Sequence, residues 1–181
     1  MAKILTILAP GFEEIEAVAP CDIWRRLGFS VTVAGLDDMQ TTGAHGIVIE
    51  CDALLDEVKE LAFDAVFLPG GMPGSVNLRN DERVCELVSG MANEGKIVSA
   101  ICAAPMVLSK CGVLNGKRFT MYPGMDSYLA NGNTPVSELA VADGNVITGK
   151  GPGAVFEFAA KVADALGTDA GKCLASMMVE R

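Results

Sequence analysis

One cysteine stands where the sequence predicts the end of a buried strand and the beginning of a helix. The segment reads Ser99-Ala-Ile-Cys102-Ala-Ala-Pro105, with small residues around the cysteine. This pattern is typical of a nucleophile elbow, a tight turn that projects one side chain above a sheet. Unpaired N–H groups at the start of a helix favour a thiolate over a thiol. We therefore predict that Cys102 is a reactive nucleophile, although a buried structural cysteine is the commoner fate of this residue type.

The position of Cys102 also predicts a thiol pKa clearly below the ~8.5 of a free cysteine. The other cysteines carry no such signal, and we expect each to be a small packing residue: Cys21, Cys51, Cys85, Cys111 and Cys173. Six cysteines in 181 residues without a recognisable secretory signal do not indicate a disulfide framework. Because the sequence contains no CxxC motif or Cys/His cluster, we expect no metal site.

Glu16 is the second residue that could take part in chemistry. It ends the acidic segment Gly11-Phe-Glu-Glu-Ile-Glu16. Acids in the first turn of a helix usually complement the helix dipole and face solvent, and we keep that interpretation for Glu13 and Glu14. Glu16 instead falls within an apolar stripe at helical spacing, formed by Phe12, Ile15, Ala19 and Ile23. A carboxyl group that faces inward has a raised pKa and can stay protonated. Spacing alone leaves both orientations of Glu16 open.

Two glycine-rich segments follow predicted strands. In Leu68-Pro-Gly-Gly-Met-Pro-Gly74 the consecutive glycines allow backbone N–H groups to converge on an anion or oxyanion, or they form a tight turn with positive φ. Neither a GK[ST] sequence nor GxGxxG is present, which excludes a phosphate loop. We interpret Gly149-Lys-Gly-Pro-Gly153 as a structural turn. The lone histidine, His45, is expected to be exposed or interfacial and not a catalytic base.

Short apolar runs alternate with helical stretches and must position these residues. Strands are predicted at residues 3–9, 29–36, 64–68 and 96–101, and helices at residues 13–27, 83–93, 103–110 and 154–166. The alternation predicts an α/β fold, a doubly wound sandwich with a mostly parallel sheet whose strand ends carry the three loops above. Residues 139–148 are predicted to form a hairpin and residues 43–49 a further added strand. We expect one domain over residues 1–181, with a carboxyl-terminal helix after about residue 168.

Composition limits the class of protein. Half of the residues are hydrophobic and a fifth are charged, which excludes a disordered or fibrous chain. The net charge of −9 makes nucleic acid and anionic membranes poor partners. The apolar start of the chain is interrupted by Thr6 and followed by Pro10-Gly11, which favours a strand over a signal peptide. We therefore expect a cytoplasmic protein without a membrane span.

Six motifs in this order resemble the ThiJ/PfpI superfamily, in the branch of the Parkinson disease protein 7, called protein deglycase. The resemblance extends from Lys3 to about Leu166. Beside the segments at residues 11–16, 68–71 and 100–105, it is carried by Asp22-Ile-Trp-Arg-Arg26, by Val33-Ala-Gly-Leu36, and by Gly151-Pro-Gly153 together with Phe156-Glu-Phe158 as one motif. It implies a flavodoxin-like fold with Cys102 on a nucleophile elbow, no cofactor, and a homodimer.

The resemblance also implies roles for individual residues. Glu16 matches a glutamate whose protonated carboxyl hydrogen-bonds the cysteine sulfur. The backbone N–H groups of Gly70, Gly71 and Ala103 match those that surround the sulfur and bound oxyanions. Arg26 matches an arginine that reaches the site region at the dimer interface.

Two positions depart from the pattern of the family. Peptidase-like relatives have a histidine directly after the cysteine, where this chain has Ala103, so we do not expect a peptidase. In the branch that the chain resembles, a histidine often lies in the loop matched here by Thr120-Met-Tyr-Pro123. Tyr122 occupies that position, so another group must carry the proton transfers, or they are slow.

These observations predict a cysteine-dependent glyoxalase or protein deglycase. The Cys102 thiolate would add to a small carbonyl substrate such as methylglyoxal, or to a glycated protein, and Glu16 would move the protons. Sequence does not separate the two activities. An alternative is a redox sensor or chaperone of oxidative stress, in which Cys102 is oxidised to sulfinic acid without turnover. A binding module for a small metabolite is a third possibility.

Overall fold

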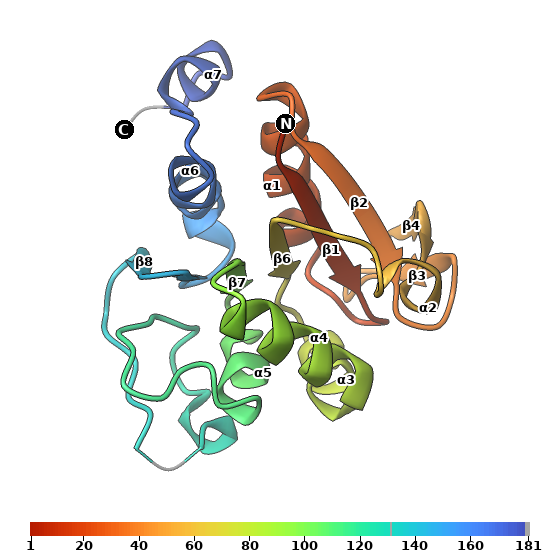
Figure 1. Ribbon diagram of the computed structural model, residues 1–181, viewed down its shortest axis with the longest axis vertical. Helices are drawn as coiled ribbons and strands as arrows, with labels where there is room; N and C mark the ends of the chain where they lie inside the picture. Colours follow the sequence, from red (N-terminus) through yellow and green to blue (C-terminus); the bar gives the residue numbers. More distant parts are fainter. Residues whose placement is uncertain (131, 180–181) are drawn as a thin grey trace.

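The protein is described by a computed structural model that covers residues 1–130 and 132–179 (Figure 1). Its centre is a seven-stranded sheet in the order β5-β2-β1-β6-β7-β9-β8. All neighbouring strands are parallel except β8 and β9, which form an antiparallel hairpin. The strands are β1 (Lys3–Leu8), β2 (Ser30–Gly35), β5 (Ala53–Leu54), β6 (Ala65–Leu68), β7 (Ile97–Ile101), β8 (Ala140–Asp143) and β9 (Val146–Gly149).

Helices cover both faces of this sheet. They are α1 (Glu14–Arg26), α2 (Leu55–Val58), α3 (Gly74–Asn80), α4 (Glu82–Asn93), α5 (Pro105–Lys110), α6 (Val155–Ala165) and α7 (Gly171–Ser176), with 3-10 turns at Asp126–Tyr128 and Pro152–Ala154. One core lies under α2, α4 and α5, and the other under α1, α6 and α7. Figure 1 shows α3, α4 and α5 gathered together, apart from α6 and α7. None of these helices is long and apolar enough to span a membrane.

The strand order confirms the predicted doubly wound, flavodoxin-like α/β fold. Alternate residues of one strand enter different cores, as Ile4 and Leu5 do, which explains the uninterrupted apolar runs. The order reverses between β1 and β6, and ligands bind at such switch points beside the carboxyl ends of the strands. The loops after β1, β6 and β7 meet at that edge, so the topology brings residues 9–16, 69–73 and 102–104 close together.

Three features differ from the expectations. Residues 43–49 do not form one strand: β3 (Gln40–Thr42) and β4 (Val48–Glu50) pair as a separate antiparallel hairpin, and residues 43–47 form its turn. Gly46 has a φ of +84°, which suits a turn and not a strand. Helix α3 was not expected, because glycines and proline at its start conceal a helical pattern.

The third difference concerns two cysteines that were expected only to pack. Cys85 on α4 and Cys111 at the end of α5 are joined by a disulfide, with Cα atoms 5.4 Å apart. The pairing follows from the packing of α4 against α5, which a sequence separation of 26 residues does not reveal.

Candidate active site

Cys102 lies at a sharp turn between β7 and α5. Its φ of 63° is in the left-handed region, which among the described residues only one other non-glycine residue adopts. This conformation is costly for a residue with a side chain and is often retained at functional sites. The Cys102 N–H donates to the Gly149 carbonyl at 2.9 Å, and its carbonyl accepts from the Tyr122 N–H at 2.8 Å. The peptide groups on both sides of the strained residue are therefore held in place, and the turn is a nucleophile elbow.

The small residues after the cysteine are required by close packing. Ala103 and Ala104 are buried, and the backbone N–H groups of Ala103 and Gly71 approach the sulfur closely enough to lower its pKa. Gly71 has a φ of +94°, and a side chain there would overlap the backbone of residues 11–13. Glycine at this position lets the loop after β6 reach the sulfur.

Glu16 points into the protein from the first turn of α1 and is completely buried. Its Oε2 accepts a hydrogen bond from the Gly70 N–H at 3.0 Å. Its Oε1 is buried without a hydrogen-bond partner among the described residues. A methyl group at Gly70 would overlap Glu16 Oε2 and lie 2.6 Å from the Cys102 Cβ atom, so these three residues converge. The Gly70 N–H was expected to face the sulfur or an oxyanion, but it holds the carboxyl group instead.

The ionisation of Glu16 and Cys102 is coupled. Burial raises the pKa of Glu16 to about 7, the side-chain interaction with Cys102 opposes this shift, and the charge on Glu13 adds to it. Burial, and then the Glu16 carboxylate, raise the pKa of the Cys102 thiol. The expected lowering of the Cys102 pKa is therefore wrong, because burial disfavours the thiolate and the adjacent Glu16 carboxylate opposes a second negative charge. The two groups therefore do not ionise together, and a Cys102 thiolate requires that Glu16 holds a proton.

Arg26 is not brought to this site within the chain. It lies in the last turn of α1, ten residues from Glu16, which is about 15 Å along a helix. Its Nε donates to Asp22 Oδ2 at 2.8 Å on the exposed surface.

The rotation of α1 also differs from the expected apolar stripe. Ile15 was placed in that stripe but is 56% exposed. Val18, one turn further along the helix, is about half exposed. The buried side of the helix is instead formed by Glu14, Glu16, Ala17, Pro20, Cys21, Ile23 and Trp24. Helical spacing fits more than one rotation, and the contacts of Glu16 with the Gly70 loop and of Trp24 with Ala159 on α6 select this one.

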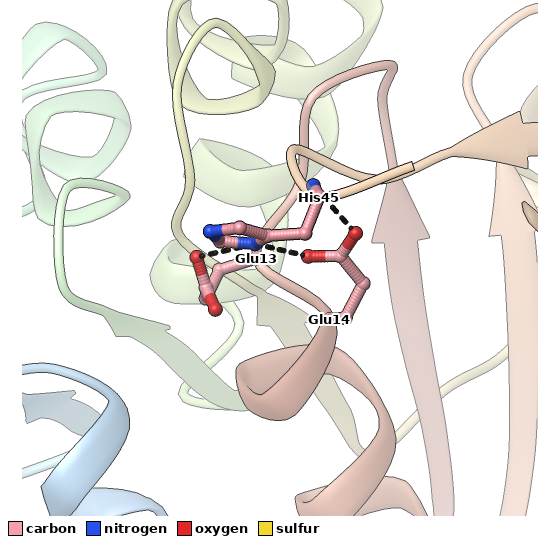
Figure 2. Close-up of side chains that lie close together, drawn as sticks. All are labelled: Glu13, Glu14 and His45. Carbon is pink, nitrogen blue, oxygen red and sulfur yellow. Dashed lines mark hydrogen bonds and ion pairs between the residues drawn. The ribbon is translucent and has the colours of Figure 1, made fainter. Parts of the chain in front are cut away.

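Glu14 makes a structural contact that sequence reasoning missed. Expected to face solvent, it is only 6% exposed and lies against the β3–β4 turn (Figure 2). One carboxyl oxygen accepts from the His45 N–H at 2.7 Å, and the other lies 2.9 Å from His45 Nδ1. His45 Nδ1 also lies 3.7 Å from Glu13 Oε2. The donor atoms of these three residues are within 4.8 Å of one another, but the turn already occupies both Glu14 oxygens. The cluster fastens the hairpin to the start of α1, beside the site.

A strained cysteine coupled to a buried carboxyl group, on a flavodoxin-like sheet, is characteristic of α/β proteins that carry a cysteine nucleophile. Comparison with known sequences is more specific. A model of the DJ-1/PfpI family matches residues 2–165, and the chain belongs to this family.

Individual relatives agree with this assignment. The chain is 43% identical to protein dj-1beta of Drosophila melanogaster over 90% of its own length and 88% of that protein. It is 34% identical to deglycase PfpI of Pyrococcus furiosus, over 85% and 93% of the two chains. The crystal structure of Drosophila melanogaster DJ-1beta superposes with a TM-score of 0.95, at 38% identity and 99% coverage of both chains.

Proposed function

We propose that the protein is a cysteine-dependent glyoxalase or protein deglycase that acts on 2-oxoaldehydes or their protein adducts. The observation that carries the proposal is the pairing of Cys102, at a positive φ, with the buried Glu16 carboxyl group whose pKa is raised to about 7. A group that titrates near neutral pH can both donate and accept protons during turnover. The deglycase named among the relatives supports the same chemistry.

The first step forms a bond between the Cys102 sulfur and the aldehyde carbon. The carbonyl π electrons move to oxygen, which takes a proton from Glu16 and yields a hemithioacetal. The N–H groups of Gly71 and Ala103, which interact with the sulfur, would stabilise the charge that develops on the carbonyl oxygen. The Gly70 N–H keeps the carboxyl group in position.

Glu16 carboxylate then removes the proton from the former aldehyde carbon and returns it to the adjacent ketone carbon, while the hydroxyl proton of the hemithioacetal moves to the ketone oxygen. The first carbon is thereby oxidised to a thioester and the second reduced to an alcohol, so no external oxidant is consumed. Water cleaves the thioester, which releases a 2-hydroxyacid and restores the Cys102 thiol.

The test is conversion of methylglyoxal to lactate. Cys102→Ser is expected to abolish it while the protein stays folded, and Cys173→Ser, at a half-buried free cysteine on α7, should retain the wild-type rate. Full activity in the Cys102 variant would exclude the proposed nucleophile. Rapid oxidation of Cys102 by peroxide, with no lactate formed by the wild type, would favour the redox-sensor alternative.

The proposal extends to a homodimer in the cytoplasm. Exposed apolar side chains on α1 (Ile15, Val18) and on the β3–β4 hairpin (Ile47, Val48) support a contact with a second copy, across which Arg26 would reach the partner's site. Light scattering should give a mass in solution of twice the chain mass of 18.9 kDa. Val18→Asp should lower the measured mass to that of a single chain. A wild-type monomer at micromolar concentration would contradict the dimer.

A further inference from the structure

A hollow of about 260 Å³ lies between the loop after α5 and the loop after β9. Its walls are formed by Tyr122, Pro123, Leu139, Lys150, Pro152 and Ala154, with the backbone of glycines 151 and 153. Tyr122 is 46% exposed and Leu139 is 53% exposed, so both present apolar carbon at the surface of the hollow. This Tyr122 hollow has no role in the proton transfers proposed above.

Backbone hydrogen bonds attach both walls of the hollow to the nucleophile. Tyr122 on one wall donates its N–H to the Cys102 carbonyl at 2.8 Å. The Cys102 N–H donates to the carbonyl of Gly149, the residue that leads into the other wall. The two walls are therefore held at a defined position relative to the backbone of Cys102.

The Tyr122 ring rests on the backbone of the opposite wall. A Cβ atom added to Gly151 would lie 3.3 Å from Tyr122 Cδ2 and 3.8 Å from Cε2. The ring thus packs where a side chain at Gly151 would crowd it. The one charged group of the lining, Lys150, donates its ammonium to Ser137 Oγ at 3.0 Å, which directs the charge away to Ser137. The lining of the Tyr122 hollow that a ligand can contact therefore consists mainly of ring and aliphatic carbon.

We propose that the Tyr122 hollow binds the carbon substituent of the carbonyl substrate and selects 2-oxoaldehydes with an aryl or branched alkyl group over methylglyoxal. This rests on the proposed function, because the substituent is held there by the bond between the carbonyl carbon and Cys102. An apolar substituent covers the exposed carbon of Tyr122 and Leu139, whereas a charged substituent would lose its hydration without a partner. Tyr122 is therefore a specificity-determining residue and not a proton carrier.

The first measurement is the ratio of kcat/KM for phenylglyoxal to that for methylglyoxal. Tyr122→Ala should lower this ratio about tenfold relative to wild type, and Leu139→Ala should lower it severalfold. Tyr122→Phe, which keeps the ring, should leave it unchanged. Leu61→Ala is the matched control, since Leu61 is equally exposed but precedes β6, at the other end of the sheet. Comparing ratios between variants cancels the different intrinsic reactivities of the two aldehydes.

The second measurement does not require turnover. Phenacyl chloride and chloroacetone alkylate Cys102 at the same kind of carbon and differ only in the aryl or methyl substituent. In Tyr122→Ala the rate with phenacyl chloride should fall about tenfold, while the rate with chloroacetone stays within twofold of wild type. If the wild type converts neither aldehyde but shows this selectivity, the proposed function fails and the hollow is still a binding site. An equal loss of alkylation rate with both reagents, or no loss with either, would refute binding of the substituent in the hollow. If Tyr122→Ala does not fold, the same two rates are measured in Leu139→Ala.

Discussion

Replacing Glu16 with glutamine should change how the stability of the protein depends on pH. The amide keeps the shape of the side chain but does not ionise. In wild type, burial raises the pKa of Glu16 from 4.5 to about 7. At about 1.4 kcal/mol per unit, this shift corresponds to ~3 kcal/mol of free energy of unfolding.

The raised pKa of Glu16 determines whether stability rises or falls with pH. The folded protein holds the Glu16 proton more tightly than the unfolded chain, so the contribution to stability is fully present below pH 4.5. It is lost as the pH rises through about 7, where the buried carboxyl group ionises. The free energy of unfolding of wild type relative to Glu16→Gln should therefore fall by ~3 kcal/mol between pH 4.5 and pH 8.

Urea unfolding of both proteins at intervals across this range measures the difference directly. Other carboxyl groups cancel in the comparison, and the Cys102 thiol stays protonated in the unfolded chain over most of it. Glu157→Gln, which removes an exposed carboxyl group from α6, is the matched control and should follow the wild-type curve. Parallel curves for wild type and Glu16→Gln would show that Glu16 is not buried in an uncharged form, and the proposed proton transfers would lose their basis.

Three further predictions follow from single contacts. Gly70→Ala should destabilise the protein by about 1–3 kcal/mol in urea unfolding and slow alkylation of Cys102 at least tenfold, because the added methyl group overlaps the Glu16 carboxyl group; wild-type behaviour would place the loop elsewhere. Reduction of the Cys85–Cys111 disulfide with dithiothreitol should lower Tm by roughly 10 °C, since a loop of this length contributes about 3 kcal/mol, and the double serine variant should not respond. His45→Ala should lose stability mainly below pH 6.5, because hydrogen bonding to Glu14 raises the pKa of His45. The contribution of protonated His45 to the free energy of unfolding disappears as the pH rises through that raised value. A loss that does not depend on pH, measured by urea unfolding, would contradict this.

The central sheet and its main helices could be predicted from local pattern. The four strands expected at residues 3–9, 29–36, 64–68 and 96–101 are found as β1, β2, β6 and β7, with ends that differ by at most one residue. Runs of Val, Ile and Leu identify such strands because both faces of a parallel sheet are buried. The elbow could be located for a related reason, since only small residues fit where a strand turns at once into a helix.

What local pattern did not decide is which partner each polar side chain meets. Glu14 and Glu16 lie in the same helical turn with the same chemistry, yet one holds a hairpin through His45 and the other holds the Gly70 loop beside Cys102. Their partners are 31 and 54 residues away along the chain, and the disulfide joins residues 26 apart. Sequence determined the residue types, the elements and the edge of the sheet where chemistry takes place. Only the tertiary structure determined the rotation of α1, and with it the buried carboxyl group and the raised pKa, because desolvation depends on all the atoms that surround a group and not on its neighbours in sequence.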